Sequence, residues 1–341
     1  MRHPGPPLVS VVTPFFNTED HLEECIESVL AQTYRHFEYI LANNCSTDRS
    51  VEIAEQYAAR DPRIRLIHNE RFLPQLPNYN QALRRISPNS RYFKMVQADD
   101  AIFPRCLEEM VAVAEANPSV GVVSSYRKVG EGIGPLGLPR TKTVMSGREA
   151  VRLNLTEDLY LFGTQTAVLV RSDIVRARQP FYAEESFFAD VDVVYDILAE
   201  HDFAFVHQVL SFTRVEQDSI VGRVRSYNPL ILERLLRLKS SGPAYLSPEE
   251  QDKYLGEHRR IYRRFLAEAW LRRREPGFWE FHRKGLSRIG EEIDRSRFPI
   301  DAVPVVLHHA LRPQTAARWL VRRARRLLGR RPNVERPQVR R

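Results

Sequence analysis

The chain has 341 residues, 43% of them hydrophobic, which is enough to bury the core of one large domain or of two smaller ones. It has no run of ~18 apolar residues that would span a membrane, and its first residues do not read as a secretory signal. Its three cysteines include no CxxC pair, which argues against a disulfide framework or a thiolate metal site and favours a reducing compartment.

Positive charge is concentrated in the last third of the chain. Residues 1–224 carry 23 Lys and Arg against 30 Asp and Glu, a net charge of −7, whereas residues 225–341 carry 28 against 13, a net charge of +15. Two such different parts are expected to face different partners. We therefore predict a first domain over 1–225 and a basic α-helical extension over 226–341, with the boundary near Tyr227–Pro229.

The first half alternates β-rich runs with segments of helical period. Strands are predicted at Leu8–Thr13, Phe37–Ala42, Ile64–His68, Tyr92–Val96 and Val120–Tyr126. Helices are predicted over Glu19–Gln32, after an N-cap at Asp48, from a first turn with Pro77 to about Ile86, and over Pro104–Ala116. A strand-like Thr166–Val170, a helix-like Asp190–Ala199 and a segment Phe203–Phe212 follow. This alternation predicts an α/β fold with a mostly parallel sheet flanked by helices.

Polar residues stand directly after three of the predicted strands. They are Asn17, the pair Asn43-Asn44, and Asp99-Asp100 in the segment QADD. Ligands bind outside the carboxyl ends of the strands in such sheets, so these residues are expected at one edge. Adjacent carboxylates suit Mg²⁺ or Mn²⁺, which take oxygen ligands and keep positions for water and phosphates. A solvated acidic turn before the next helix is the alternative, and local sequence leaves both open.

The segments VSVVTPFFN, FEYILANNCSTDRS and QADD, in this order, resemble the bacterial family-2 glycosyltransferases. The resemblance covers about Leu8 to Tyr126 and, more loosely, extends to about Ser219. It implies a GT-A-like (Rossmann-like) domain that moves a sugar from a nucleoside diphosphate to an acceptor hydroxyl with inversion. It also implies a divalent cation, Mn²⁺ or Mg²⁺, and a role in cell-surface or extracellular polysaccharide or glycolipid synthesis.

The resemblance assigns a nucleotide-sugar site at the strand ends. Pro14 and Phe16 match positions that line the nucleotide base, and Asn17 belongs to the same segment. Asn44 matches an acidic residue that usually contacts the base. Its amide can both accept and donate hydrogen bonds, so base identity stays open. Asn80 matches an asparagine of the family and is assigned to the same site, next to Tyr79 where an arginine is common.

The metal and the acceptor side are assigned in the same way. Asp99 matches the last acid of the family's D-x-D motif, the main metal contact. Gln97 takes the place of the first acid and cannot supply charge, which makes the metal site more dependent on Asp100. Asp190 matches the acid at the start of a late helix and is the expected general base. Asp192 is the alternative base, and an acid-decorated helix start is the structural alternative to both.

Three further segments complete the sequence-based assignment. Arg214, in VLSFTRVEQDS, matches an arginine on a short return strand and is placed near the phosphates. Gly132–Gly137 has the spacing G-x-G-x-x-G, but Pro135 prevents the helix that a dinucleotide site needs, which favours a loop. A nucleotidyltransferase and a non-catalytic nucleotide-sugar-binding module remain rival functions. The first lacks a Gly-rich phosphate loop, and the second is suggested by Gln97 and by Ala189 in place of a glutamate.

The tail is predicted to form a basic amphipathic helix over Gln314–Leu328. The apolar residues Ala317, Leu320, Val321, Ala324, Leu327 and Leu328 fall on one face, and arginines occupy the rest. Such a helix is typical of binding to an anionic membrane surface, here the inner face of the cell membrane next to a cytoplasmic enzyme. Packing against the protein is the alternative, and no nucleic-acid-binding motif is present.

Overall fold

The computed structural model describes residues 5–130, 132–135, 138–157, 159–186, 188–214 and 225–310. The chain divides into two compact units, Met1–Arg223 and Val224–Arg341. No helix in the described ranges is long and apolar enough to cross a membrane. The predicted basic helix at Gln314–Leu328 lies outside the described residues.

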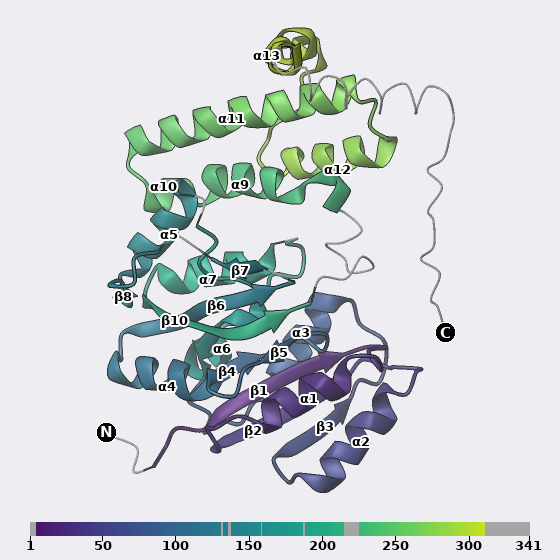
Figure 1. The fold of residues 1–341 in the computed structure, drawn as a ribbon, viewed down its shortest axis with the longest axis vertical. Helices are drawn as coiled ribbons and strands as arrows, with labels where there is room; N and C mark the ends of the chain where they lie inside the picture. The colour runs from purple at the N-terminus through teal and green to yellow at the C-terminus, as the bar shows by residue number, and fades with distance from the viewer. Residues whose placement is uncertain are drawn as a thin grey trace, which may run out of the picture. The chain divides into compact units, whose positions relative to one another are not determined.

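The first unit is built on one mixed sheet in the order β3-β2-β1-β4-β9-β6-β10-β5, with β7 paired to β6 and β8 to β10 (Figure 1). The strands are β1 (Val9–Phe15), β2 (Phe37–Asn43), β3 (Ile64–His68), β4 (Tyr92–Met95), β5 (Ala101–Ile102), β6 (Val120–Val129), β7 (Gly132–Gly134), β8 (Val144–Met145), β9 (Leu169–Arg171) and β10 (Asp202–Thr213). β1 to β4 are parallel, and so are β6 and β10. The predicted mostly parallel α/β sheet is confirmed.

The antiparallel pairs of the sheet were not predicted. β9 runs antiparallel to both β4 and β6, and thereby joins the two parallel halves. β5 and β8 pair antiparallel with β10, and β7 pairs antiparallel with β6. Gly132–Gly134, expected in a loop, therefore forms a short edge strand. Leu136 and Gly137 of the same glycine-rich run lie outside the described residues.

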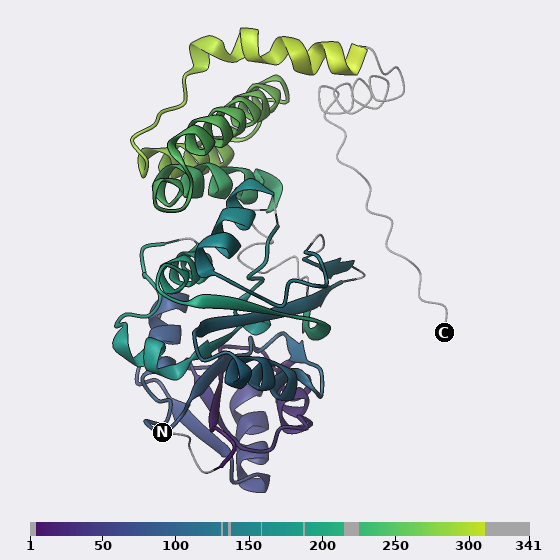
Figure 2. The same ribbon diagram turned by 90° about the vertical axis from the view of Figure 1, so that its left-hand side faces the viewer.

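Helices flank this sheet (Figures 1 and 2). They are α1 (Leu22–Leu30), α2 (Ser50–Arg60), α3 (Gln75–Leu83), α4 (Cys106–Ala116), α5 (Gly147–Thr156), the 3-10 turn η1 (Gln165–Ala167), α6 (Ser172–Ala177) and α7 (Ala189–Leu198). α1 buries Leu22, Cys25, Ile26 and Val29, the i, i+3, i+4, i+7 pattern of a helix with one apolar face. All residues of β1 and β2 are buried, as expected for central strands covered on both faces.

Two local predictions need correction. α2 has Arg49 as its N-cap, one residue after the predicted Asp48, yet an Asp48 carboxylate oxygen still accepts a hydrogen bond from the Ser50 N–H at 3.0 Å. The predicted strand Thr166–Val170 is η1 followed by the shorter β9. The Thr166 hydroxyl forms side-chain hydrogen bonds that a strand position would not favour, as described below for the site.

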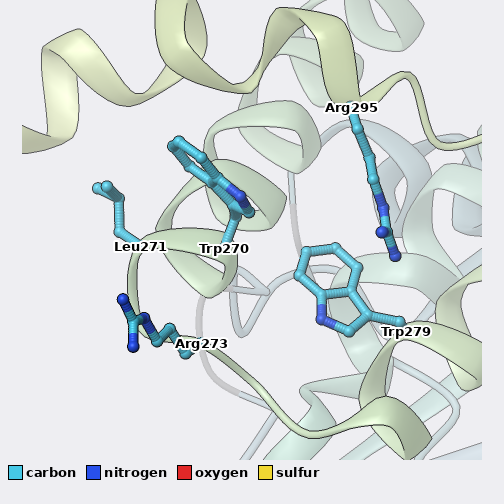
Figure 3. Close-up of a pocket in the computed structure, with 5 residues that line it drawn as sticks. All are labelled: Trp270, Leu271, Arg273, Trp279 and Arg295. Atoms are coloured by element: carbon cyan, nitrogen blue, oxygen red, sulfur yellow. The ribbon is translucent and has the colours of Figure 1, made fainter. Parts of the chain in front are cut away.

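The described part of the second unit is helical. It comprises η2 (Arg225–Tyr227), α9 (Pro229–Ser240), α10 (Gly242–Tyr245), α11 (Pro248–Leu271), α12 (Pro276–Ser287), η3 (Arg295–Arg297) and α13 (Phe298–Ala310). Ser247 and Glu250 form a capping box at the start of α11. After α11 the chain turns at Arg273, which has a φ of 49°. A pocket of about 360 Å³ opens at this turn (Figure 3).

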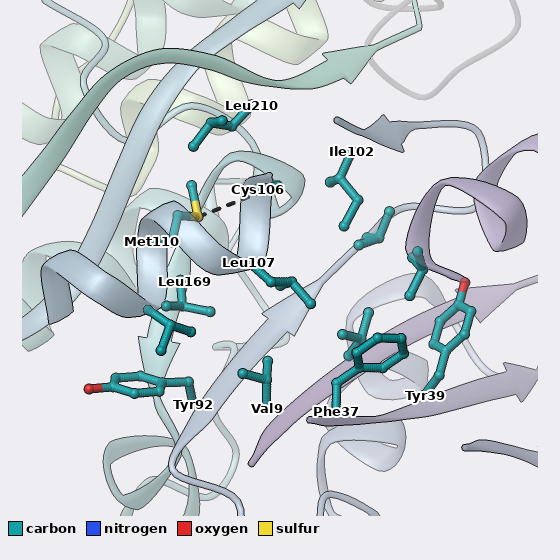
Figure 4. Close-up of a cluster of buried hydrophobic side chains, with 14 of the residues drawn as sticks. Val9, Phe37, Tyr39, Tyr92, Ile102, Cys106, Leu107, Met110, Leu169 and Leu210 are labelled. Atoms are coloured by element: carbon teal, nitrogen blue, oxygen red, sulfur yellow. Dashed lines mark hydrogen bonds between the residues drawn. The ribbon is translucent and has the colours of Figure 1, made fainter. Parts of the chain in front are cut away.

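One face of the sheet in the first unit packs on α1 and α4 and forms the core below the predicted site. Val9, Phe37 and Tyr39 from the strands meet Leu107 and Met110 from α4 in this cluster (Figure 4). These side chains are at most 3% exposed. Burial of each large apolar side chain stabilises the fold by roughly 1.5–3 kcal/mol. The strand ends that carry polar residues are therefore anchored in a rigid, close-packed base.

Candidate functional site

The acidic turn follows β4, at the carboxyl edge of the parallel part of the sheet. Asp99 is partly exposed there, whereas Asp100 is 4% exposed. The Asp100 N–H donates to the Gln97 carbonyl oxygen at 3.0 Å, which closes a tight turn. The two neighbouring carboxylates thus point into different environments. Asp99 is the acid of this turn that a ligand can reach.

Asp100 is held from two sides. The Thr166 hydroxyl donates to one carboxylate oxygen at 2.6 Å, and the Arg214 backbone N–H donates to the other at 3.1 Å. Burial raises the pKa of Asp100 to about 7, and the charge of Asp99 adds to the rise. Both oxygens already accept hydrogen bonds, so this carboxyl group is suited to positioning the turn and β10 relative to each other.

Arg214 lies where its sequence assignment requires, next to the acidic turn. Its Nε donates to the Asp99 carbonyl oxygen at 3.1 Å, and its Nη2 pairs with a Glu24 carboxylate oxygen at 2.5 Å. Its guanidinium also stands 5.4 Å from the centre of the Phe212 ring. The guanidinium and backbone of Arg214 therefore tie the end of β10 to the turn and to α1. The predicted contact with phosphates remains a prediction.

A row of neutral hydrogen-bonding side chains replaces the first acid of the motif. The Tyr79 hydroxyl donates to the Gln97 side-chain oxygen at 2.7 Å and accepts from Gln75 Nε2 at 2.7 Å. The Gln97 side-chain nitrogen donates to the Gln165 side-chain oxygen at 3.3 Å. Burial raises the pKa of Tyr79, which keeps its hydroxyl neutral. Gln97 thus joins α3 to η1 and brings no charge to the site.

Two asparagines assigned to the nucleotide sugar bind the protein's own backbone. The Asn44 side chain accepts from the Leu73 N–H at 3.0 Å and donates to the Leu73 carbonyl at 2.8 Å. The Asn80 side chain does the same with Tyr182, accepting at 2.8 Å and donating at 2.9 Å. Both asparagines are 4% exposed. In the described structure they fix loops at the edge of the sheet.

The residues after β1 are more accessible. Pro14 is buried within the strand, whereas Phe16 is 42% exposed and packs edge to face on Phe72, with ring centres 4.8 Å apart. Asn17 has a φ of 49° and accepts a hydrogen bond from the Thr47 N–H at 2.8 Å. The exposed aromatic pair offers a surface on which a flat base can stack. The Asn17 side chain connects the β1 and β2 loops.

Asp190 is the second residue of α7 and lines a small cavity with Tyr182 and Gln165, among others. One of its carboxylate oxygens accepts from the Val191 N–H at 3.0 Å. Since Gln165 also contacts Gln97, the cavity is connected through one side chain to the acidic turn. The structure therefore brings the predicted base and the turn with Asp99 into one neighbourhood, although they are far apart in sequence.

The alternative base has a structural partner. Asp192 accepts a hydrogen bond from the Ser186 hydroxyl at 2.6 Å, and the Ser186 oxygen accepts from the Phe188 N–H at 3.1 Å. This arrangement braces the first turn of α7. The geometry favours Asp190 over Asp192 as the residue that lines the cavity.

Arg127, at the end of β6, is a residue of the site that the sequence did not indicate. Burial lowers its pKa, and Tyr160, Asp100 and Asp190 act in the opposite direction. Its guanidinium lies 5.4 Å from the Tyr160 ring. Within the described residues, its buried Nε and Nη1 atoms have no hydrogen-bond partner. Arg127 thus supplies positive charge that both Asp100 and Asp190 experience.

The loop before η1 is shaped for Arg127 and for the acidic turn. Gly163 has a φ of 66°, and a Cβ placed on it would collide with Arg127 and Ala167. Thr166 accepts from the Gln97 N–H at 3.1 Å while donating to Asp100. The buried Lys94 ammonium donates to the Thr166 carbonyl at 2.5 Å, and burial lowers its pKa. None of these three roles is visible in the local sequence.

The fit of a divalent cation rests on Asp99. No group of three Asp, Glu, His or Cys side chains within the described ranges could hold a metal ion without help. Asp100 has both oxygens engaged, and Gln97 is a neutral amide. One carboxylate together with substrate phosphates is nevertheless a usual way to bind Mg²⁺. The residues present thus fit an ion that the donor diphosphate would largely hold.

The sheet order, the acidic turn after β4 and the acid at the start of α7 define a GT-A-type transferase fold. Residues 10–178 match the family described as Glycosyl transferase family 2, and the chain belongs to this family. The family resemblance and the GT-A-like fold inferred from the sequence are both confirmed.

Curated relatives match over part of their length. The chain is 40% identical over 112 residues to the uncharacterized glycosyltransferase EpsJ of Bacillus subtilis (strain 168), which is 33% of this chain and 31% of that protein. It is 29% identical over 181 residues to the uncharacterized glycosyltransferase YibD of Escherichia coli (strain K12), 51% and 52% of the two chains. The chain thus spans about a third to a half of these relatives.

Solved structures share the fold at low identity. TarS 1–349 of S. aureus in complex with UDP-GlcNAc has a TM-score of 0.59 at 17% identity, covering 82% of this chain and 80% of that one. The mannosyltransferase PcManGT of Pyrobaculum calidifontis, in complex with GDP-Man and Mn²⁺, has a TM-score of 0.51 at 14% identity, covering 96% and 89%. At these identities the likeness establishes the fold.

Proposed function

We propose that this protein is an inverting glycosyltransferase that moves a sugar from a nucleoside-diphosphate sugar to an acceptor hydroxyl. The observation that carries the proposal is that the cavity lined by Asp190 connects, through Gln165 and Gln97, to the turn that carries Asp99 in a family-2 fold. Gln165 links the two positions, and Arg127 experiences the charge of Asp190 and of the acidic turn. A ligand-reachable carboxylate at a strand end and a second one at a helix start are what donor binding and base catalysis require.

The donor is proposed to lie along the strand ends of β1, β2 and β4. Phe16 and Phe72 would stack on the base, and the diphosphate would reach Asp99 through Mg²⁺ or Mn²⁺. The ion, when bound, neutralises the leaving diphosphate. TarS and PcManGT are described with uridine and guanosine donors, respectively, and this supports a nucleotide-sugar donor without fixing the base. The buried Asn44 amide, already bonded to Leu73, leaves base choice to other groups.

The chemical step assigned to the chain is removal of the acceptor proton. The acceptor oxygen attacks the anomeric carbon while the bond from that carbon to the diphosphate oxygen breaks. The hydroxyl proton moves to a carboxylate oxygen of Asp190. Attack opposite the leaving group inverts the configuration at the anomeric carbon. The charge of Asp190 raises the pKa of Arg127 against the effect of burial, which keeps the guanidinium positive next to the proposed base.

The wider role is proposed from relatives and from charge. A putative teichuronic acid biosynthesis glycosyltransferase, TuaG of Bacillus subtilis (strain 168), is 38% identical over 94 residues, 28% of this chain and 36% of that protein. This supports polysaccharide or glycolipid synthesis. We further propose that the catalytic domain covers residues 1–225 and that the basic extension, 226–341, brings it to the anionic inner face of the cell membrane.

The experiment that tests the proposed function replaces Asp99 by Ala. We expect the variant to lose manganese-enhanced binding of UDP or GDP, measured by calorimetry, and to lose sugar transfer from a panel of nucleotide sugars. The fold should persist, because an accessible carboxylate contributes little to stability. Asp252→Ala, which removes an exposed carboxylate from α11, is the matched control and should bind like the unaltered chain.

The same measurements separate the rival functions. A non-catalytic binding module would bind nucleotide sugars in a manner dependent on Asp99 but transfer no sugar to any acceptor. A nucleotidyltransferase would release pyrophosphate from a nucleoside triphosphate and a sugar phosphate. Binding that is equally manganese-dependent in Asp99→Ala would show that the donor site lies elsewhere.

A further inference from the structure

The helical unit has a pocket of its own, lined by aromatic and cationic side chains. Trp270 and Leu271 come from the end of α11, Arg273 from the following turn, Trp279 from α12 and Arg295 from η3 (Figure 3). Its volume of about 360 Å³ lies within the ~300–1,000 Å³ usual for ligand pockets. Among the described side chains that line it, none is acidic. Neither the family match nor the proposed transfer accounts for this pocket.

The aromatic part of the pocket is held rigidly. The ring of Phe298 lies 6.0 Å from Trp270 and 5.7 Å from Trp279, so it supports both indoles. The Trp279 indole N–H donates to the Arg274 carbonyl at 3.2 Å, which fixes its orientation. Trp270 is 44% exposed, an unusual exposure for the largest apolar side chain. The accessible indole face is mainly that of Trp270, because Trp279 is half-buried and has the Arg295 guanidinium over its ring. An accessible indole face is a surface on which the apolar C–H face of a sugar ring packs.

The cationic part is placed at the rim. The Arg295 guanidinium stands 5.2 Å from the centre of the Trp279 ring, toward which its side chain extends in Figure 3. Arg273 and Arg295 are both exposed. Two guanidiniums in a lining whose described side chains carry no carboxylate favour an anionic ligand, and their forked donors suit carboxylate and phosphate groups.

Arg273 occupies a backbone position that favours glycine. It follows the C-cap of α11, has a φ of 49°, and its N–H donates to the Trp270 carbonyl at 3.0 Å. Helices commonly end with glycine in this left-handed conformation, because a side chain there is strained. An arginine at such a position costs stability that a glycine would not.

We propose that this pocket binds an anionic saccharide, with sugar rings against Trp270 and Trp279 and carboxylate or phosphate groups on Arg273 and Arg295. Each part of the ligand is matched by a feature of the pocket. The indoles recognise the ring, the arginines recognise the charge, and the open mouth admits a chain. That this saccharide is the growing acceptor rests on the proposed function, whereas the binding itself does not.

The test measures tryptophan fluorescence of the full chain carrying Trp319→Phe, which leaves two of the three tryptophans, both in the pocket. Trigalacturonate, with three sugar rings and three carboxylates, should quench the emission saturably. Maltotriose, with three rings and no charge, should bind at least tenfold more weakly. Tripolyphosphate, with charge and no ring, should bind at least fivefold more weakly. Equal binding of either probe would overturn the proposal.

The decisive variant is Arg273→Gly. We expect at least a fivefold loss of trigalacturonate affinity together with an unchanged or higher melting temperature, since glycine relieves the strained backbone. If Arg273 had a purely structural role, the melting temperature would be unchanged or higher, but the trigalacturonate affinity would not fall. Arg295→Gln should also weaken binding. Arg260→Gln removes an exposed charge from α11 about 15 Å along the helix from Trp270 and should bind normally.

Two outcomes would overturn the proposal. One is unchanged trigalacturonate affinity in Arg273→Gly and Arg295→Gln. The other is quenching by vesicles of phosphatidylcholine and phosphatidylglycerol but not by trigalacturonate, which would assign the pocket to a lipid surface. UDP binding, measured in the same variants, tests the proposed transferase function separately from the saccharide pocket. Its dependence on Asp99 reports on the donor site whatever the saccharide result.

Discussion

Asp100 in the α/β unit and His282 in the helical unit are both buried titratable groups, but their surroundings differ. The two carboxylate oxygens of Asp100 accept hydrogen bonds from the Thr166 hydroxyl and the Arg214 N–H. The Nδ1 atom of His282 lies 2.7 Å from the Tyr262 hydroxyl oxygen, and its Nε2 atom lies 2.9 Å from the Tyr227 carbonyl oxygen. The pKa of Asp100 is raised by burial to about 7, and that of His282 is lowered by burial to about 4.

The two groups differ in whether their hydrogen-bond partners match the neutral form or the ionised form. Neutral imidazole has one donor and one acceptor, and the site of His282 offers one partner for each. Asp100 instead has donors that match its ionised form, near the cationic Arg127. Burial thus favours the neutral form of both groups. They differ in their hydrogen-bond partners, because only Asp100 has donors that can stabilise its ionised form.

The largest expected effect concerns Asp190, the other carboxylate near Arg127. Replacing it with Asn keeps its size but removes the proton acceptor, so we expect turnover to fall by ~10²–10⁴-fold, the usual contribution of a general base. Donor affinity should barely change, because this carboxylate is assigned to the acceptor. Steady-state rates with a saturating donor, combined with calorimetry of UDP binding, check both statements.

Asp192→Asn is the internal control for that measurement. Asp192 is bonded to Ser186, so its loss should destabilise the start of α7 mildly and reduce turnover less. If Asp192→Asn were inactive and Asp190→Asn active, the assignment of the base would be shifted by two residues.

The next effect concerns the pH dependence of the α/β unit without ligand. The folded pKa of Asp100, about 7, lies above the ordinary value of ~3.9, so the folded state binds more protons between these values. Its stability should therefore fall as pH rises from about 4 to 7, by on the order of 4 kcal/mol. Hydrogen exchange of amides in β4 and α4 would report the change. In Asp100→Asn this decrease should disappear, and a persistent slope would assign it to another group.

The smallest effect concerns the helical unit and has the opposite sign. The folded pKa of His282, about 4, lies below the ordinary 6.5, so the unfolded state binds more protons between these values. Stability should fall as pH drops from about 6.5 to 4, by on the order of 3 kcal/mol. Exchange of amides in α11 and α12 should therefore speed up in acid beyond its intrinsic rate. His282→Gln can keep both hydrogen bonds without titrating and should flatten the profile.

Much of the α/β unit could be predicted because its strands are apolar and its helices carry one buried face. β3 has the predicted bounds, and the predicted ranges of β1, β2 and β4 differ from the observed ones by at most two residues at either end. Helix α5 was not predicted, and the antiparallel direction of β9, which the predicted strand Thr166–Val170 overlaps, was missed for a physical reason. β9 is three residues long, and its direction is set by β4 and β6, its neighbours in space rather than in sequence. Short strands carry too little periodicity to reveal such partners.

The site was predicted unevenly. Asp99, Asp190 and Arg214 were assigned from the resemblance to the family. In the structure Arg214 contacts the acidic turn, and the Asp190 cavity connects to this turn through Gln165; the roles of all three remain predictions. The backbone bonds of Asn44 and Asn80 could not be foreseen, because their partners lie 29 and 102 residues away. The sequence did not indicate Arg127 as a residue of the site either, because an arginine at the end of a strand is usually solvated. Its burial depends on the approach of the Gly163 loop.

The bond between the Arg214 N–H and Asp100 spans 114 residues of sequence. During synthesis, the acidic turn therefore leaves the ribosome long before the strand that completes it. Until β10 docks beside β6 and β5, the Asp100 carboxyl lacks one of its two donors and the turn lacks the arginine that closes over it. Contacts of such long range form late in folding because the chain must first close a large loop. The acidic turn is therefore complete only once β10, made last of the three strands, has docked.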